Sequence, residues 1–193
     1  MTSFAHIVAQ RRSIRRYETR QVGEAEIRAV LDLARHAPSS MNGQPCHFVV
    51  IRERDTLRRI AAVKNRYCPP EKRAYPADFI ADAPLLVAVC VERERSFGRG
   101  LENGVLATGF LLLAARAHGL GSVFLTAYQH DEPGLAAEIG ALLSLPESIE
   151  PIALVPLGFP AEQPPDKELR PLPEIVHHER FARELPGERR HAP

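Results

Sequence analysis

The chain has 193 residues, of which 45% are hydrophobic and 25% charged, and its formal net charge at pH 7 is +1. A chain of this length and composition can bury a hydrophobic core, so we expect one globular domain and exclude a disordered or fibrous protein. The near-neutral charge gives no overall attraction to nucleic acid or to an anionic membrane.

Cysteine usage and apolar runs favour a cytoplasmic protein. The three cysteines, Cys46, Cys68 and Cys90, are far apart and include no CxxC pair, so they suggest neither a disulfide framework nor a zinc site. The N-terminus lacks the apolar core of a signal peptide, and the longest apolar run, from Phe110 to Ala115, is far too short to cross a bilayer. We therefore expect no association with a membrane.

The first half of the chain alternates between helical and extended patterns. Phe4, Ile7 and Val8 have the spacing of one helix face, and if this helix continues, Arg11 and Arg15 lie on one side of it. The patterns that follow predict a helix over residues 24–36 ended by Pro38, a strand over 47–52, a helix capped by Asp55 and running to Val63, an irregular excursion over 64–83, and a buried strand over 85–91. Long ordered excursions are often functional.

The second half is built around a helix over residues 101–117, which is apolar almost all round, as a core helix is. Gly104 and Gly109 favour close approach by another helix, and Gly119 is expected to cap the end. Further along we expect a strand over 122–126, a helix from Asp131 to near Leu143, and a strand over 149–157 in which Pro151 and Pro156 favour an edge position or a short pairing.

The order of these elements predicts an α/β or α+β domain of three layers over residues 1–160. After Pro160 the composition becomes proline-rich and charged, with too few apolar residues for a separate core. Residues 161–193 are therefore expected to form a C-terminal arm, extended over residues 172–177.

Four arginines lie close together near the N-terminus, in the sequence RRSIRRY at residues 11–17. An arginine bonds phosphate oxygens through two N–H groups at once and keeps its charge, so two convergent guanidinium groups with the Ser13 hydroxyl suit a phosphate. On its own, such a cluster is more typical of a solvated basic face.

A second polar motif, PSSMNGQP at residues 38–45, lies between a predicted helix and a predicted strand. Its prolines keep the backbone out of a helix, and its hydroxyls, amides and backbone N–H groups suit the edge of a planar heterocycle with carbonyls and ring nitrogens. Taken alone, it is simply a good turn sequence.

The two motifs together favour the functional interpretation. RRSIRRY, a helix and then APSSMNGQPCHFVVI resembles the nitroreductase family of FMN-dependent oxidoreductases, and the resemblance continues through ADAPLLVAVCV, HGLGSVFL, LPESIEPIALVPLGFPAE and RPLPEIVHHERF. It covers nearly the whole chain, from Phe4 to Phe181. The resemblance implies an α+β fold with α/β/α layers, a mixed central sheet, and a homodimer across which the C-terminal arms are exchanged.

The same resemblance implies a set of FMN-binding residues. They are Arg11, Arg12, Ser13 and Arg15 at the phosphate and ribityl chain; Pro38, Ser39, Ser40, Asn42 and Gln44 at the flavin of the other subunit; Leu125, Thr126 and Ala127 at the N5 edge; and Lys167 and Arg170 at the phosphate. Many family members have paired glycines or Glu-Gly where this chain has Thr126-Ala127. Which group bonds flavin N5 is therefore open at this point.

As a family member, the chain would bind FMN tightly and pass a hydride from NADH or NADPH through flavin N5 to a small electron-poor acceptor, such as a nitroaromatic or a quinone, by ping-pong kinetics. This chemistry requires no side-chain acid or base. Reductive dehalogenation or oxygen-dependent flavin chemistry on the same fold is an alternative.

Two further possibilities are disfavoured. Nucleic-acid binding through residues 11–16 conflicts with the near-neutral charge and with the absence of a helix-turn-helix pattern. Metal binding is not expected, because His177 and His178 are adjacent and lack other ligands.

Overall fold

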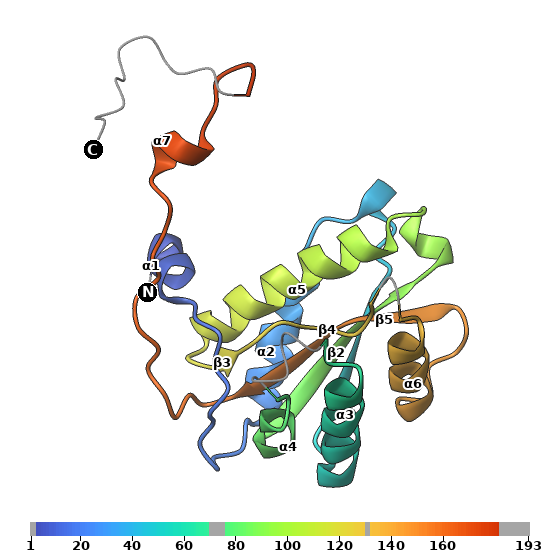
Figure 1. The fold of residues 1–193 in the computed structure, drawn as a ribbon. Helices are drawn as coiled ribbons and strands as arrows, with labels where there is room; N and C mark the ends of the chain where they lie inside the picture. Colours follow the sequence, from blue (N-terminus) through green and yellow to red (C-terminus); the bar gives the residue numbers. More distant parts are fainter. Residues whose placement is uncertain (1–2, 70–75, 130–131, 182–193) are drawn as a thin grey trace.

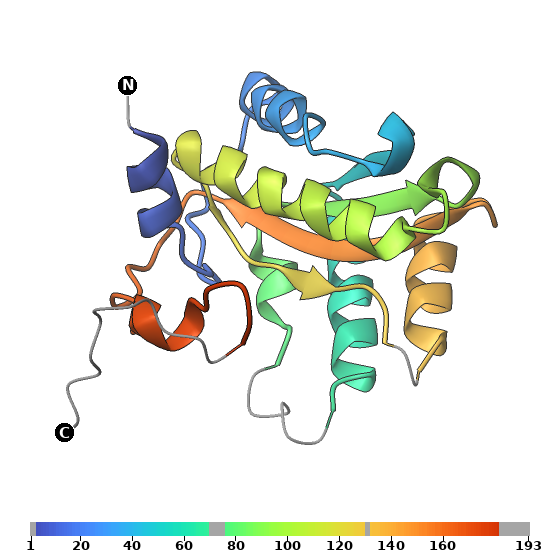
Figure 2. The same cartoon turned by 90° about the horizontal axis from the view of Figure 1, so that it is seen from above.

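A computed structural model describes residues 3–69, 76–129 and 132–181. These residues form a five-stranded sheet between two layers of helices (Figures 1 and 2). The strands pair antiparallel in the order β1-β2-β5-β3, with β4 also pairing with β5, and a parallel bridge joins Ser13 to Ser122. The elements are α1 Phe4–Gln10, α2 Glu24–Ala34, the 3-10 turn η1 Ser40–Asn42, β1 Cys46–Ile51, α3 Arg54–Arg66, α4 Phe79–Asp82, β2 Leu85–Glu92, the 3-10 turn η3 Glu94–Ser96, α5 Gly100–Ala117, β3 Gly121–Ser122, β4 Leu125–Thr126, α6 Gly134–Leu142, β5 Ile149–Gly158 and α7 Leu172–Ile175.

The sheet carries a separate hydrophobic core on each face. Leu85 and Val87 of β2 pack with α2 and α5, whereas Leu86 and Ala88 pack with α3, α4 and α6. Because successive side chains of a strand point to opposite faces, a strand covered on both sides must be apolar at every position. The predicted buried strand and the predicted α+β fold of three layers are both confirmed.

For the proline-containing strand we expected an edge position or a short pairing, and the edge position is wrong. Its pairings with β3 and with β4 are short, at two residues each. β5 lies inside the sheet, with β2 on one side and β3 and β4 on the other. Pro156 lies between the residues that pair with β4 and those that pair with β3, and Pro151 faces β2 where the register shifts at Cys90. The two prolines, which have no N–H group to donate, thus lie where the strand pairing is interrupted or irregular. The sequence alone does not show where such interruptions fall.

Several predicted boundaries also differ from the structure. The helix predicted from Asp55 to Val63 begins at Arg54, after Glu53, and continues to Arg66. Its last turn is held by hydrogen bonds from Asn65 to Asp78 and from Arg66 to Glu138. The strand predicted over residues 122–126 is divided into the short strands β3 and β4. Asp131 lies outside the described residues, as do residues 70–75 of the predicted excursion.

The close approach predicted for α5 involves a strand and not another helix of this chain. A Cβ at Gly104 would lie 2.7 Å from Ile152 Cγ1 on β5, so the glycine lets the helix sit directly on the sheet. A Cβ at Gly109 would meet nothing within 4 Å. Gly119 ends the helix with a φ of +75°, which confirms it as the C-terminal cap.

The segment after Pro160 leaves the body and runs beside α1 (Figures 1 and 2). Residues 172–177, predicted to be extended, instead contain the short helix α7, whose start Pro171 and Pro173 favour through their fixed φ. Large apolar side chains along residues 169–181 are exposed. Their exposed fractions are 79% for Leu169, 70% for Leu172, 49% for Ile175, 45% for Val176 and 87% for Phe181.

Candidate functional site

The arginine motif lies on a non-helical segment, because α1 ends at Gln10 and Arg11 already has an extended backbone. The prediction that Arg11 and Arg15 share one side of a helix is therefore wrong. The Ile14 N–H donates to the Ser122 carbonyl at 3.0 Å, which draws the segment onto β3. The Ile14 side chain is buried directly on Gly121, where a Cβ would lie 2.7 Å from Ile14 Cγ2.

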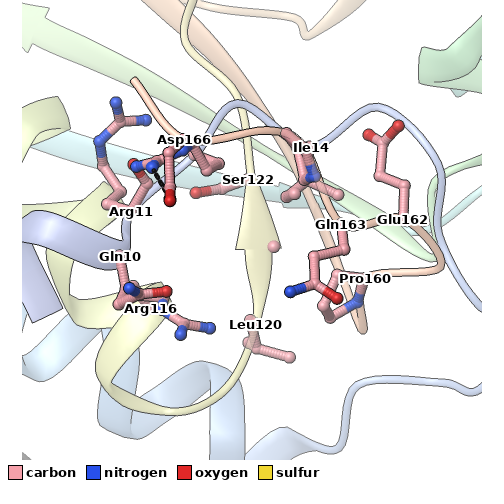
Figure 3. Close-up of a pocket in the computed structure, with 13 residues that line it drawn as sticks. Gln10, Arg11, Ile14, Arg116, Leu120, Ser122, Pro160, Glu162, Gln163 and Asp166 are labelled. Atoms are coloured by element: carbon pink, nitrogen blue, oxygen red, sulfur yellow. Dashed lines mark hydrogen bonds and ion pairs between the residues drawn. The ribbon is translucent and has the colours of Figure 1, made fainter. Parts of the chain in front are cut away.

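A pocket of about 300 Å³ opens beside this segment (Figure 3). Figure 3 shows Gln10, Arg11 and Arg116 on one side of it, with Glu162 and Gln163 on the other. The full lining is Gln10, Arg11, Arg12, Ile14, Arg116, Leu120, Gly121, Ser122, Pro160, Glu162, Gln163, Pro164 and Asp166. The pocket thus adds Arg116, from the end of α5, to two of the predicted arginines, while Ser13 and Arg15 do not line it.

The two pocket arginines of the motif differ in their partners. The Arg12 guanidinium donates to Asp166 Oδ1 at 3.0 Å, to the Pro165 carbonyl at 3.1 Å and to the Ala9 carbonyl at 2.8 Å, which ties α1 to the tail. Among the described residues, the Arg11 guanidinium has no hydrogen-bond or ion-pair partner. Arg11 is therefore the arginine that can meet an external anion.

Lys167 lies close enough to Arg11 and Arg12 to interact with their charges, although it does not line the pocket. Desolvation and the positive charges of Arg11 and Arg12 lower the pKa of Lys167 below its ordinary value. An anion placed among these three groups would relieve their mutual repulsion. Arg170 does not line the pocket in this chain either; its Nε lies 3.3 Å from Glu174 Oε2 on α7.

Glu162 fixes the backbone of the motif, a role that the sequence did not reveal. Its Oε1 accepts the N–H groups of Arg15, at 2.5 Å, and Arg16, at 3.1 Å. The Arg15 guanidinium lies over the Phe79 ring of α4, 5.9 Å from the ring centroid. Arg15 thus points away from the pocket and toward the α4 side of the sheet.

The second motif forms a loop in an unusual backbone conformation. Met41, Asn42 and Gln44 have φ values of 49°, 53° and 49°, the left-handed region that non-glycine residues rarely adopt. Each such residue costs about 1–3 kcal/mol, and residues of this kind cluster at functional sites. Met41 is 80% exposed, so no packing of its own side chain explains the strain.

Neighbouring residues hold this loop in place. The buried Asn103 side chain of α5 accepts the Ser40 N–H at 2.9 Å, and Ser39 Oγ accepts the Gln44 N–H at 2.9 Å. Arg95 Nε donates to the Gly43 carbonyl at 2.9 Å. The sequence missed Asn103 and Arg95 because both lie far along the chain from the loop.

The loop and the pocket lie at opposite ends of α5. Asn103 anchors the loop near the first turn, and Arg116 lines the pocket in the last turn. At 1.5 Å per residue, these two positions are about 20 Å apart along the helix. One chain therefore does not bring the two predicted halves of the site together.

The predicted N5-edge segment turns the N–H and the C=O of one residue, Thr126, away from the sheet. The Ala127 N–H donates to the Ile152 carbonyl at 3.0 Å, and Thr126 lies opposite Ala153. Because bonded and non-bonded pairs alternate in an antiparallel ladder, the N–H and C=O of Thr126 point away from β5. Lys64 Nζ, at the end of α3, donates to that carbonyl at 2.7 Å. No sequence motif marks Lys64, whose position depends on the packing of α3.

Within residues 3–69, 76–129 and 132–181, no helix combines the length and apolar character that crossing a membrane requires. The same residues contain no cluster of three or more His, Cys, Asp or Glu side chains that could ligate a metal.

Comparison with known proteins identifies the class to which this fold and pocket belong. A family model described as the nitroreductase family matches residues 8–159. The chain therefore belongs to the nitroreductase family, which confirms the resemblance carried by its two N-terminal motifs.

Three relatives illustrate the range of this similarity. A Methanothermobacter thermautotrophicus protein with the provisional name NADH dehydrogenase/NAD(P)H nitroreductase is 35% identical, covering 90% of this chain and 85% of the relative. The iodotyrosine deiodinase of Thermotoga neapolitana is 26% identical, covering 82% and 89%. A crystal structure from Desulfovibrio desulfuricans, provisionally described as a nitroreductase in complex with FMN, is 30% identical with a TM-score of 0.75, covering 94% and 99%.

Proposed function

We propose that the protein is an FMN-dependent oxidoreductase that uses NADH or NADPH to reduce a small electron-poor acceptor, such as a nitroaromatic or a quinone. The observation that carries this proposal is the cluster of Arg11, Arg12 and Lys167 in a chain of the nitroreductase family. A flavin phosphate is the kind of anion that such a cluster suits. The relative with bound FMN supports the choice of cofactor.

The residues of this chain would divide the binding of FMN among themselves. Arg11, with Lys167 beside it, would hold the phosphate, Ser13 and Arg15 would follow the ribityl chain, and Arg12 would keep the tail against α1. Thr126 would offer its N–H to flavin N5, because the N–H groups of the flanking residues point into the ladder with β5. The Thr126 N–H is thus the group that we propose for the bond to N5, which the Thr126-Ala127 sequence left open.

The active unit in this proposal is a homodimer with two flavins at the interface. The loop at residues 38–45 lies about 20 Å from the pocket along α5, so a second copy would supply the loop to each flavin. Val105, Leu106 and Phe110 of α5 are 42%, 44% and 39% exposed and offer an apolar face to that copy. The arm at residues 161–193 would cross to the partner, where Arg170 would reach the phosphate.

FMN, when bound, would supply the hydride chemistry, and the protein would supply binding, orientation and electrostatics. The strained loop and the Thr126 peptide would hold the flavin plane, leaving one stacking surface that the nicotinamide and the acceptor occupy in turn. No side-chain acid or base is needed, and ping-pong kinetics follow from the shared surface. A cytoplasmic location stays a prediction.

Stopped-flow absorbance with FMN-loaded protein tests this proposal. Either NADH or NADPH should bleach the flavin absorbance in the blue, and a nitroaromatic or quinone should restore it. Initial rates should give parallel double-reciprocal plots. Intersecting plots, or a flavin that neither nicotinamide reduces, would contradict the proposed reaction.

A second candidate reaction, reductive dehalogenation, is favoured by the similarity to the Thermotoga neapolitana protein named iodotyrosine deiodinase. It would use the same flavin site with a halogenated phenol as the acceptor. Testing 3-iodotyrosine as an acceptor, beside a nitroaromatic and a quinone, separates the two reactions. Iodide release that is faster than nitroaromatic reduction would favour dehalogenation.

A further inference from the structure

The carbonyl of Thr126 is held by a charged donor. Lys64 Nζ lies 2.7 Å from that oxygen, on the side of β4 that points away from β5. Hydrogen bonds from an ionised donor are roughly twice as strong as those between neutral groups. The Thr126 carbonyl belongs to the same planar peptide unit as the Ala127 N–H, which donates to the Ile152 carbonyl. Lys64 and Ile152 therefore hold the two ends of that unit, and with it the backbone that carries the Thr126 N–H. Since the Thr126 N–H and C=O share one side of β4, the ammonium lies on the side that would face the flavin.

Hydrogen bonds of the neighbouring residues hold the end of α3, which carries Lys64, in place. The next residue, Asn65, accepts the Ala77 N–H at 2.7 Å and donates to Asp78 Oδ1 at 2.6 Å, which ties the end of α3 to the start of α4. Arg66 and Tyr67 both bond the Glu138 carboxylate on α6, at 2.7 and 2.8 Å. Asn65, Arg66 and Tyr67 thus anchor the helix end that carries Lys64. The Lys64 ammonium therefore has a defined position.

We propose that Lys64 is a positioning residue for the flavin edge: it fixes the Thr126–Ala127 peptide unit, and thereby the adjoining backbone whose Thr126 N–H would meet N5, and it places a positive charge beside that edge. This inference rests on the proposed FMN function. Two-electron reduction of FMN leaves a negative charge on the ring system at neutral pH, and a nearby cation favours the charged form. Lys64 would therefore raise the reduction potential of bound FMN, so that the flavin accepts a hydride more readily.

The reduction potential of the bound FMN tests the electrostatic part. In Lys64→Met the ratio of reduced to oxidised flavin at a fixed redox poise should fall about tenfold, which is a shift of about 30 mV for a two-electron couple. Lys64→Arg, which keeps the charge and a donor, should recover most of the difference. A wild-type potential in Lys64→Met would overturn the proposed charge effect.

Amide hydrogen exchange in the FMN-free protein tests the anchoring part. The Ala127 N–H, bonded to Ile152, reports whether β4 stays docked on β5. Its exchange should accelerate about tenfold in Lys64→Met, the effect of losing one charge-assisted hydrogen bond, and should recover in Lys64→Arg. Val87 and Val89 of β2 serve as the reference for global unfolding, because both are completely buried in the central strand. Unchanged Ala127 exchange relative to this reference would overturn the anchoring role.

Arg59→Met is the matched control, since it removes an exposed cation from the same helix and Arg59 takes no part in the bonds that hold Lys64, Thr126 or the end of α3. It should change neither the potential nor the exchange of Ala127; equal effects in both variants would overturn a specific role for Lys64. If the wild-type protein binds no FMN, the proposed function fails, and the exchange experiment still decides whether Lys64 anchors Thr126.

Discussion

Among single residues, the two adjacent arginines at the pocket illustrate how similar side chains take different roles. Arg12 is bound on several sides by Asp166, Pro165 and Ala9, so its charge is already used within the protein. Arg11 has no such partner among the described residues and lines the same pocket. The composition of the motif indicated an anion site, but only the tertiary contacts distinguish the arginine that stabilises the fold from the one that can bind.

This difference gives a prediction for the cofactor. Arg11→Ala should weaken FMN binding about ten- to a hundredfold, because a hydrogen bond to a charged group contributes about 1.5–3 kcal/mol and each 1.4 kcal/mol is a factor of ten. Arg11→Lys should recover only part of the affinity, since lysine cannot bond bidentately. Quenching of FMN fluorescence measures the dissociation constant.

Arg16→Ala is the control for this prediction, because Arg16 is exposed on the same segment and outside the pocket. It should retain the wild-type affinity. Equal affinities for wild type and Arg11→Ala would remove Arg11 from the phosphate site.

The sequence does not predict the roles of residues that lie outside its motifs. Arg116, Glu162, Asn103 and Lys64 contact the predicted site, yet each lies far from its partner in the sequence. Their roles arise from where α3, α5 and the tail pack, and a spacing pattern along the chain carries no information about such contacts.

At the scale of whole elements, local periodicity was a reliable guide where burial determines the pattern. The apolar run of β2 was predicted, because both cores enclose this strand and the requirement appears directly in composition. The apolar helix α5 was also predicted, although only one of its faces packs on a core and Val105, Leu106 and Phe110 stay exposed in one chain. The continuation of α1 and the edge position of β5 were predicted wrongly. In both cases a contact with a distant strand decides the outcome: Ser122 draws residues 13–14 out of the helix, and β3 with β4 covers the outer side of β5.

The packing of α5 on β5 yields a stability prediction. Gly104→Ala should lower the free energy of unfolding by about 1–3 kcal/mol, the usual cost of overpacking, because the new methyl group would press on Ile152. Urea denaturation followed by circular dichroism measures the change.

Gly140→Ala on α6 is the matched substitution, since a Cβ at that position meets nothing within 4 Å. It should be neutral or stabilise the protein by up to about 1 kcal/mol, because alanine is the better helix former. If both variants lose the same stability, the contact between Gly104 and Ile152 does not limit the packing.

For the whole molecule, the exposed apolar residues are concentrated on α5, on α1 and along the tail. Phe4 and Val8 of α1 are 71% and 42% exposed, and the tail exposes Leu169 and Phe181 at 79% and 87%. Exposed apolar side chains gathered on a few elements in this way favour an interaction site. We propose a second copy of the chain as the partner, because it would also complete the flavin site.

A charge on the apolar face of α5 tests this assembly. Leu106→Glu should give monomers that bind FMN weakly, because burying an unpaired carboxylate in an interface is strongly unfavourable. Multi-angle light scattering measures the mass, and FMN fluorescence measures binding in the same sample.

Leu33→Glu is the control, since Leu33 is 45% exposed, against 44% for Leu106, and belongs to a different helix, α2. It should leave both mass and affinity unchanged. A monomeric Leu106→Glu protein with wild-type FMN affinity would show that one chain holds the complete site.

The most direct test of the proposed flavoprotein is titration of FMN into the purified wild-type protein, followed by quenching of flavin fluorescence. We predict saturable binding with one FMN for each chain, and prompt bleaching of the bound flavin by NADH or NADPH. A protein that leaves FMN fluorescence unchanged at every concentration would contradict the proposal, and the cluster of Arg11, Arg12 and Lys167 would then have to bind a different anion.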